Sequence, residues 1–187
     1  RGIRSGEIIL STHAVLVGDN NVGKSTVLEA VDLVLGPERL NKRPVIDEHD
    51  FFAGQYVDDK GNPIPIQIEV VISDLSDEQA RYFRDHLEWW NEETLTLIEG
   101  PPPEETDKAH VKAALRVGFK GSYDHDEDDF LGSTFFLSPI KEDGTHDAFR
   151  TRDKRLCGFL YLRTLRTGSR ALSLKRGSLL DIIIRLS

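Results

Sequence analysis

The sequence is poor in the features that define several classes of protein. Its single cysteine, Cys157, excludes a disulfide framework within the chain, and we expect a reducing, cytoplasmic compartment. No apolar run approaches ~18 residues, so no transmembrane helix is expected, and no signal peptide is visible. The formal net charge is -8, which excludes the basic footprint of a nucleic-acid-binding domain over the chain as a whole.

Methionine is absent as well, and the sequence starts at Arg1. The apolar residues among 179–187 have the pattern of a helix that has barely begun. We therefore expect the chain to be a fragment of a longer protein. Its 187 residues are still enough for one domain with a sizeable core.

The spacing of apolar residues predicts an α/β fold. Apolar positions three and four apart predict a helix over residues 25–35, ended by Gly36-Pro37, and a second over residues 76–90, opened by a capping box of Ser76 and Gln79. Runs of β-branched and other apolar residues predict strands. These lie at residues 7–10, 14–17, 64–72, 94–98, 111–119, 134–137 and 159–162, and a last helix is expected to begin at Ser178.

One segment carries a pattern with a known chemical purpose. Residues 18–25, Gly-Asp-Asn-Asn-Val-Gly-Lys-Ser, fit the phosphate-loop pattern G-x-x-x-x-G-K-[ST] without a mismatch. Gly18 and Gly23 allow a tight backbone whose successive N–H groups form a nest for an anion. The helix that follows adds the positive end of its dipole. The predicted strand before the loop and helix after it supply the context that the motif requires.

Each position of the loop has an expected role in binding ATP. Lys24, the candidate catalytic residue, is expected to reach the β- and γ-phosphates. Ser25 is expected to offer its hydroxyl to Mg²⁺, a hard cation that prefers oxygen ligands. The residues expected to contact ATP are Gly18, Asn20, Asn21, Val22, Gly23, Lys24, Ser25 and Thr26. The alternative interpretation is a glycine turn with a solvated lysine.

Other polar groups give weaker indications. Asp50, in the acidic stretch 47–50, is a second candidate ligand for Mg²⁺, and a solvated loop is the alternative. Residues 124–129 lack the spacing of a calcium loop and are interpreted as an exposed hairpin end. Trp89-Trp90 is interpreted as core and edge packing. Basic residues late in the chain either contact DNA or phosphate or are simply solvated: Arg150, Arg152, Lys154, Arg155, Arg163, Arg166 and Arg170.

Position by position, the chain resembles the amino-terminal lobe of the ABC-type ATPase of the OLD (overcoming lysogenization defect) family, and it is broadly similar to RecF and SMC heads. Residues 17–26 with Glu29-Ala30 resemble the segment GxNNxGKSTLLEAL of that family. Further matches are residues 1–3 to an opening strand "FRGI", residues 48–51 to "ExDF", residues 66–75 to a strand followed by "DL", and residues 159–166 and 176–180 to "YLRALR" and "RGSLL". The resemblance covers nearly all of the chain.

This resemblance implies a P-loop NTPase fold, with a mixed core sheet beside an antiparallel β lobe. Residues 1–187 would form the amino-terminal part of the ATPase domain. The family's proteins are ATP-dependent DNA endonucleases that use ATP and Mg²⁺, pair their heads as homodimers, and carry a Toprim nuclease domain further along the chain. They are tied to phage defence or DNA repair. By the same analogy, Arg1 lies near the adenine.

Several parts of such an ATPase are missing from the sequence. There is no ABC signature, no apolar strand ending in Asp-Glu, no Toprim carboxylate set, and no glutamine near residues 159–162 for a Q-loop. We therefore expect the chain alone to bind ATP and to hydrolyse it poorly. The alternatives are a RecF- or SMC-like repair ATPase without a nuclease, a non-catalytic nucleotide-binding module, and a small-molecule kinase or GTPase. A GTPase would need an Asn-Lys-x-Asp guanine reader, which is absent.

Overall fold

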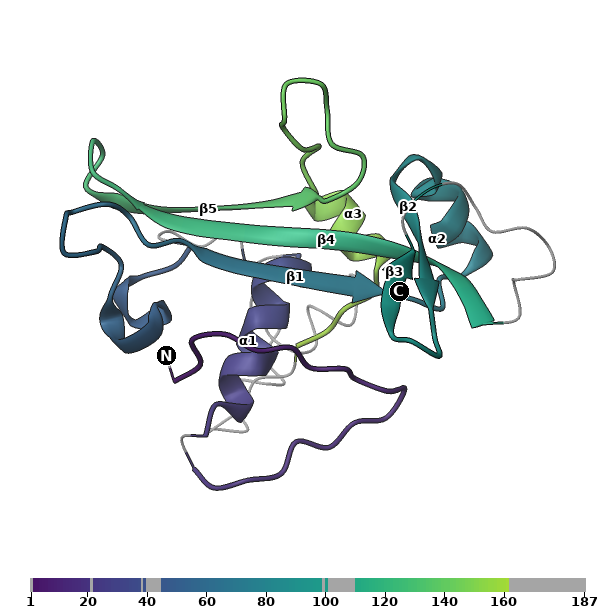
Figure 1. Ribbon diagram of the computed structural model, residues 1–187, viewed down its shortest axis with the longest axis horizontal. Coiled ribbons are helices and arrows are strands. Elements are labelled where there is room, and N and C mark those ends of the chain that lie inside the picture. Colours follow the sequence, from purple (N-terminus) through teal and green to yellow (C-terminus); the bar gives the residue numbers. More distant parts are fainter. Residues whose placement is uncertain are drawn as a thin grey trace, which may run out of the picture.

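The computed structural model describes residues 2–20, 22–37, 39, 45–98, 100 and 110–161. At the centre of this part lies a five-stranded sheet with antiparallel strand pairs (Figure 1). One face of the sheet is covered by a helix that lies beneath β1 in Figure 1. The strands are β1 (Ile66–Ile72), β2 (Leu87–Asn91), β3 (Thr96–Ile98), β4 (Val111–Asp124) and β5 (Asp129–Phe136), and the helices are α1 (Lys24–Leu35), α2 (Asp77–Tyr82) and α3 (Thr151–Leu156).

The long strand β4 organises the sheet. One of its edges pairs with β1, from Leu115 to Gly121. Its other edge pairs first with β2, along Val111 to Leu115, and then with β5, along Val117 to Asp124. β2 and β5 therefore lie one after the other along the same edge of β4. In this way β4 joins the β2–β3 hairpin to β5, although β2 and β5 do not pair with each other.

The alternation of side chains along β4 separates a buried face from an exposed face. Leu115, Val117 and Phe119 are at most 1% exposed and face the side on which α1 packs. The last turn of α1 contributes Leu33, Val34 and Leu35 to the same core. Each such side chain contributes about 1.5–3 kcal/mol by leaving water. The other buried apolar side chains of this core are Val45, Ile46, Phe51, Phe83, Phe136 and Phe149.

The opposite face of the sheet is polar and is crossed by ion pairs. Lys112 contacts Asp74 at 2.5 Å and Glu92 at 2.7 Å. Arg116 donates two hydrogen bonds of 2.8 Å to Glu88. Antiparallel sheets commonly bury one face and leave the other to water, and this sheet does so.

Much of the predicted secondary structure is confirmed, including an antiparallel β lobe. The helix expected over residues 25–35 is α1, and the Ser76–Gln79 capping box opens α2 with both of its hydrogen bonds. The strands expected at 64–72, 94–98, 111–119 and 134–137 correspond to β1, β3, β4 and β5, of which β4 and β5 extend to a turn at the acidic residues 124–129. The prediction of an exposed hairpin end there is therefore correct.

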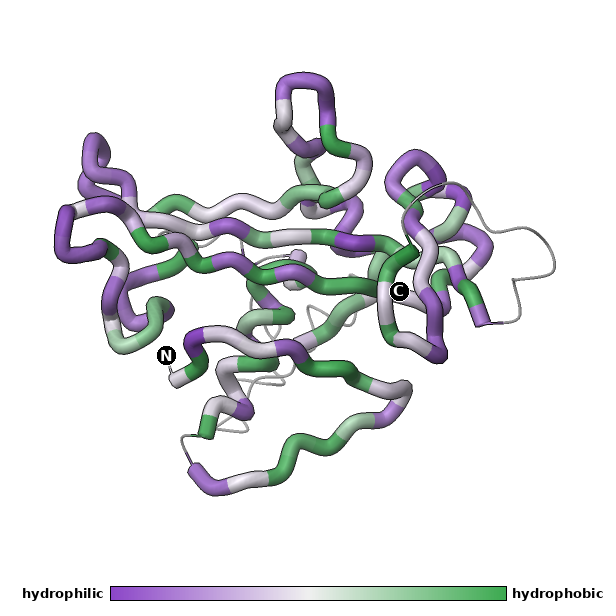
Figure 2. Tube along the Cα trace, viewed as in Figure 1, coloured by the Kyte–Doolittle hydropathy of each residue, from purple (hydrophilic) through white to green (hydrophobic). Residues whose placement is uncertain are grey.

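Two predicted strands are wrong in the described structure. Residues 7–10 and 14–17 form no strand, and most of their apolar side chains face solvent, with Val15 85% and Val17 88% exposed. Figure 2 shows these hydrophobic stretches along the lower loop of the tube. A strand requires a hydrogen-bonding neighbour, and no described segment pairs with either stretch. The expected mixed core sheet is therefore not formed by the described residues.

The predicted helix 76–90 is also wrong beyond Tyr82. Residues Leu87–Asn91 form β2, because they pair with Val111–Leu115 of β4 rather than continuing the helix. Trp89 and Trp90 are half-buried on that strand, as packing residues. Residues 159–161 form no strand, while Leu162 and the helix expected at Ser178 lie outside the described residues. Helix α3 was not expected. No helix in the described part of the chain is long and apolar enough to cross a membrane.

Replacing Gly121 with alanine should destabilise the fold by about 1–3 kcal/mol, since overpacking a filled core costs roughly this much. Gly121 lies opposite Gly132, and a Cβ on Gly121 would be 2.5 Å from Ile46 Cδ1 and 2.9 Å from Phe119 Cε1. Urea denaturation of Gly121→Ala measures the loss. Ser122→Ala, at the next position on the solvated face, is the matched control. Equal stability of the two variants would contradict the packing account.

Candidate functional site

The glycines of residues 18–25 are required by the backbone they form. Gly18 has φ 155° and Gly23 has φ 98°, a region that residues with a Cβ rarely adopt. A Cβ on Gly18 would lie 3.0 Å from Val22 Cγ2, and one on Gly23 would lie 2.8 Å from Ile3 Cδ1. The loop therefore closes tightly at both of its glycines, as the motif predicts.

The N-terminal end of α1 opens directly from this loop and is left uncapped. Gly23 occupies the N-cap position, so no side chain accepts a hydrogen bond from the first N–H groups of the helix. The first turn contains no acidic residue. Free N–H groups and the positive end of the helix dipole therefore remain available to an anion.

Lys24 lies over the loop. Its Nζ donates hydrogen bonds of 2.6 Å to the carbonyl oxygens of Gly18 and of Asp19. These two bonds hold the ammonium on carbonyl oxygens of the loop, and an ammonium has a third N–H donor. Lys24 is also the first residue of α1, so its side chain starts at the end of the helix that follows the loop.

The other residues that were predicted to contact ATP differ in how exposed they are. Ser25 lies in the first turn of α1 and is exposed, as are Asn20 and Val22, whereas Thr26 is half-buried. Asn21 and Arg1 lie outside the described residues. The sequence did not indicate the packing of Ile3 against Gly23, because nothing in the pattern of either segment links them.

Asp50 has a structural role in the described residues. It accepts a hydrogen bond from the Asp47 N–H at 3.1 Å, and its carboxylate lies 3.9 Å from the Arg39 guanidinium. The hydrogen bond from Asp47 is one half of the capping box of the single turn Glu48–Asp50, and the Asp47 side chain supplies the other half. Within the described part of the chain, no group of three His, Cys, Asp or Glu residues is arranged to hold a metal. At the loop, the uncapped N-terminus of α1 and the Lys24 ammonium suit a phosphate, and the exposed hydroxyl of Ser25 suits a phosphate-bound Mg²⁺.

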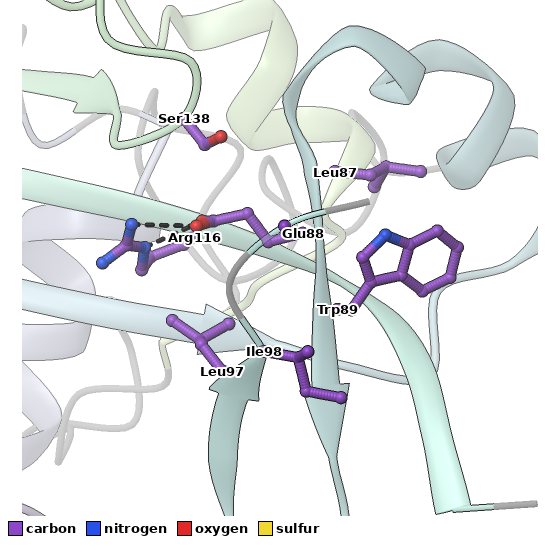
Figure 3. A pocket seen from close by; sticks show the side chains of 8 residues that line it. Leu87, Glu88, Trp89, Leu97, Ile98, Arg116 and Ser138 are labelled. Carbon is purple, nitrogen blue, oxygen red and sulfur yellow. Dashed lines mark hydrogen bonds and ion pairs between the residues drawn. The ribbon is translucent and has the colours of Figure 1, made fainter. Parts of the chain in front are cut away.

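Two concavities lie elsewhere on the surface, and neither includes a residue of the loop. The better enclosed one measures about 350 Å³ and lies where β2 and β5 meet along β4. Figure 3 shows the Arg116 guanidinium joined to Glu88 within it. Hydrogen bonds from Arg116 to Glu88 raise the pKa of Arg116 above its ordinary value. The arrangement is an ion pair that joins β2 to β4, with no nucleophile and base set against each other. Apolar side chains complete the wall: Leu87, Trp89, Leu97 and Ile98.

The second concavity, of about 590 Å³, is open and lies on α2, where Arg81 and Arg84 line it.

The basic residues predicted late in the chain do not form one exposed set. Lys154 is completely buried, so it neither contacts DNA nor is solvated, and both interpretations of this residue are wrong. Arg163, Arg166 and Arg170 lie outside the described residues.

Comparison with known proteins places part of the chain in a family. Residues 1–97 match the model of a family described as "Protein of unknown function (DUF2813)". The matched part includes the phosphate loop, α1, β1, α2, β2 and nearly all of β3, and it ends before β4. No curated protein and no solved structure matches the chain.

Gly23→Ala should destabilise the chain by about 1–2 kcal/mol, because alanine at a left-handed φ is strained and Ile3 must move to admit the methyl group. Denaturation by urea, followed by circular dichroism, measures the loss. Gly6→Ala is the control, since a Cβ there meets nothing within 4 Å. A stability of Gly23→Ala equal to that of Gly6→Ala would show that the loop does not have this geometry in solution.

Proposed function

We propose that this chain, which belongs to the family described as "Protein of unknown function (DUF2813)", binds ATP with Mg²⁺ through the loop of residues 18–25. The observation that carries the proposal is the uncapped N-terminus of α1, which follows a loop with two glycines of positive φ and with the Lys24 ammonium held on its carbonyl oxygens. Backbone N–H groups, a helix dipole and a cation converge there. Phosphate is the ligand whose charge and oxygen acceptors suit all three.

Different groups of the loop would bind different parts of the triphosphate. The N–H groups at the start of α1 donate to the phosphate oxygens that lie nearest the helix. Lys24, held by the Gly18 and Asp19 carbonyls, offers its remaining N–H to the terminal phosphates. Ser25 places a hydroxyl beside them as a ligand to Mg²⁺, which when bound neutralises phosphate charge.

Hydrolysis needs more than this loop. A carboxylate must orient the attacking water, and the sequence contains no apolar strand that ends in Asp-Glu. We therefore propose that the chain on its own binds ATP and turns it over slowly. The alternative that the same observation favours is a non-catalytic module in which ATP is only a structural ligand.

The exposed residues 14–17 favour a larger ATPase head around this lobe. Ala-Val-Leu-Val is a continuous apolar run, the pattern of a strand buried on both faces of a parallel sheet. In the described structure Val15 and Val17 are almost fully exposed. We propose that this run becomes a strand beside neighbours that the described residues do not supply, in a P-loop NTPase fold.

For the whole protein we propose an OLD-type ATP-dependent DNA endonuclease, in which ATP binding at this lobe regulates DNA cleavage by a paired head. The proposal depends on the resemblance of residues 17–26 and 159–166 to that family. The alternative is a RecF- or SMC-like DNA repair ATPase without a nuclease. A nuclease assay with divalent metal on the longer protein separates the two.

Lys24→Ala should weaken the binding of Mg-ATP about tenfold to a hundredfold, because charge-assisted hydrogen bonds contribute roughly 1.5–3 kcal/mol. Isothermal titration calorimetry on the chain and on the variant measures the change. Lys120→Ala, which removes an exposed lysine from β4, is the matched control and should bind as the wild type does. Inorganic tripolyphosphate should compete with ATP. Equal affinity of wild type and Lys24→Ala would overturn the proposed site.

A further inference from the structure

Ile3 lies against the N-terminal end of α1, although it has no part in the phosphate-loop motif. A Cβ on Gly23 would be 2.8 Å from both Cδ1 and Cγ1 of Ile3. Because a carbon–carbon bond is about 1.5 Å long, these two atoms of Ile3 lie within about 4.3 Å of the Gly23 Cα, which is van der Waals contact. Figure 1 shows residues 4–17 as a wide loop between the two partners of this contact.

The other glycine of the motif is packed by the loop itself. A Cβ on Gly18 would be 3.0 Å from Cγ2 of Val22, which belongs to the same loop and moves with it. Ile3 reaches Gly23 from a different segment of the chain. The contact at Gly23 can therefore form or break without a change in any residue of the motif.

The position of Gly23 gives the contact its importance. Gly23 is the N-cap of α1, and no side chain caps the helix there. The N–H groups of the first turn have no acceptor within the helix and point out of it past the N-cap, toward the region that a bound anion occupies. A side chain that packs on the N-cap from outside the helix therefore lies at the entrance to this region. Ile3 carries no acceptor in its side chain, so it fills space there without forming a hydrogen bond to these groups.

The contact shields only part of Ile3. This residue is 36% exposed, against 51% for Ile8 and 54% for Ile9 of the same segment. Apolar burial stabilises a contact in proportion to the area removed from water, so the contact of Ile3 with Gly23 is a weak one. Charge-assisted hydrogen bonds from the helix end to a triphosphate are stronger and can displace it.

We propose that the packing of Ile3 on Gly23 is an autoinhibitory contact: Ile3 covers the entrance to the phosphate loop, and Mg-ATP must displace it in order to bind. This inference rests on the proposed function of the loop. By linkage, a neighbour that draws residues 2–10 away from Gly23 should strengthen ATP binding, and ATP should in turn release these residues. The same segment carries the exposed Ile8, Ile9 and Leu10, whose side chains suit a strand-forming neighbour.

Ile3→Ala should bind Mg-ATP about threefold to tenfold more tightly than the wild type, because an affinity is reduced by the fraction of molecules whose site is closed. Isothermal titration calorimetry measures the change. Ile8→Ala, which shortens an exposed isoleucine of the same segment, is the matched control and should bind as the wild type does. Inorganic tripolyphosphate should show the same gain, since the contact covers the phosphate end of the site. Binding by Ile3→Ala that is equal to or weaker than that of Ile8→Ala would overturn the inference.

Methyl NMR on the isoleucine-labelled chain tests the contact itself. The δ1 methyl signal of Ile3 is assigned by its loss in Ile3→Ala. Without nucleotide, this methyl group should show a nuclear Overhauser effect to the Hα protons of Gly23, and saturating Mg-ATP should remove the effect. If the effect is missing without nucleotide, the contact does not form in solution. If it persists with ATP bound, Ile3 is not displaced. Either result overturns the inference.

The outcomes separate this inference from the proposed function. ATP binding by Ile3→Ala but not by the wild type would mean that the contact closes the site completely, which supports both proposals. Equal binding by the two chains would overturn the autoinhibitory contact and leave the proposed function standing. Failure of both chains to bind ATP would overturn the proposed function and the autoinhibitory role together, and the NMR data would still show whether Ile3 packs on Gly23.

Discussion

The packing of the last turn of α1 against the sheet is the contact on which the rest of the structure depends. Leu33, Val34 and Leu35 are buried against the apolar face of β1 and β4, and this fixes the axis of the helix. The phosphate loop has little packing of its own, since Asn20 and Val22 are exposed. The position of the loop is therefore set by α1, whose other end is packed against the sheet.

The sequence predicted those features whose causes are local. The tight backbone of residues 18–25 follows from Gly18 and Gly23, which both have positive φ, and the start of α2 follows from Ser76 and Gln79. The strand Leu87–Asn91 does not follow from a local pattern, because the residues it pairs with, Val111–Leu115, are 20 to 28 positions further along the chain. The contact of Ile3 with Gly23 and the burial of Lys154 also depend on residues that are far apart in the sequence. A lysine in a basic stretch gives no local sign that it lies inside the core.

Residues 7–17 show that a composition typical of a β-strand is not enough to form one. Val15 and Val17 have the composition of a buried strand, and the described structure leaves them in solvent. β-branched residues favour a strand only where a neighbouring strand takes up the backbone hydrogen bonds and covers the side chains. The prediction failed here because a single segment cannot meet that condition. β1 has a similar composition and is a strand because β4 lies beside it.

The chain carries a net charge of -8, and yet its candidate site is suited to an anion. The explanation is one of distance. Exposed charges more than about 8–10 Å from the loop are screened at ordinary salt concentrations, whereas N–H groups and an ammonium in direct contact with a phosphate are not. The first turn of α1 lacks an acid, and Gly23 supplies no capping side chain, so neither of these competes with an anion for the N–H groups at the start of the helix. The proposed binding of phosphate therefore depends on a few backbone groups and one lysine, and the overall charge of the protein says little about it.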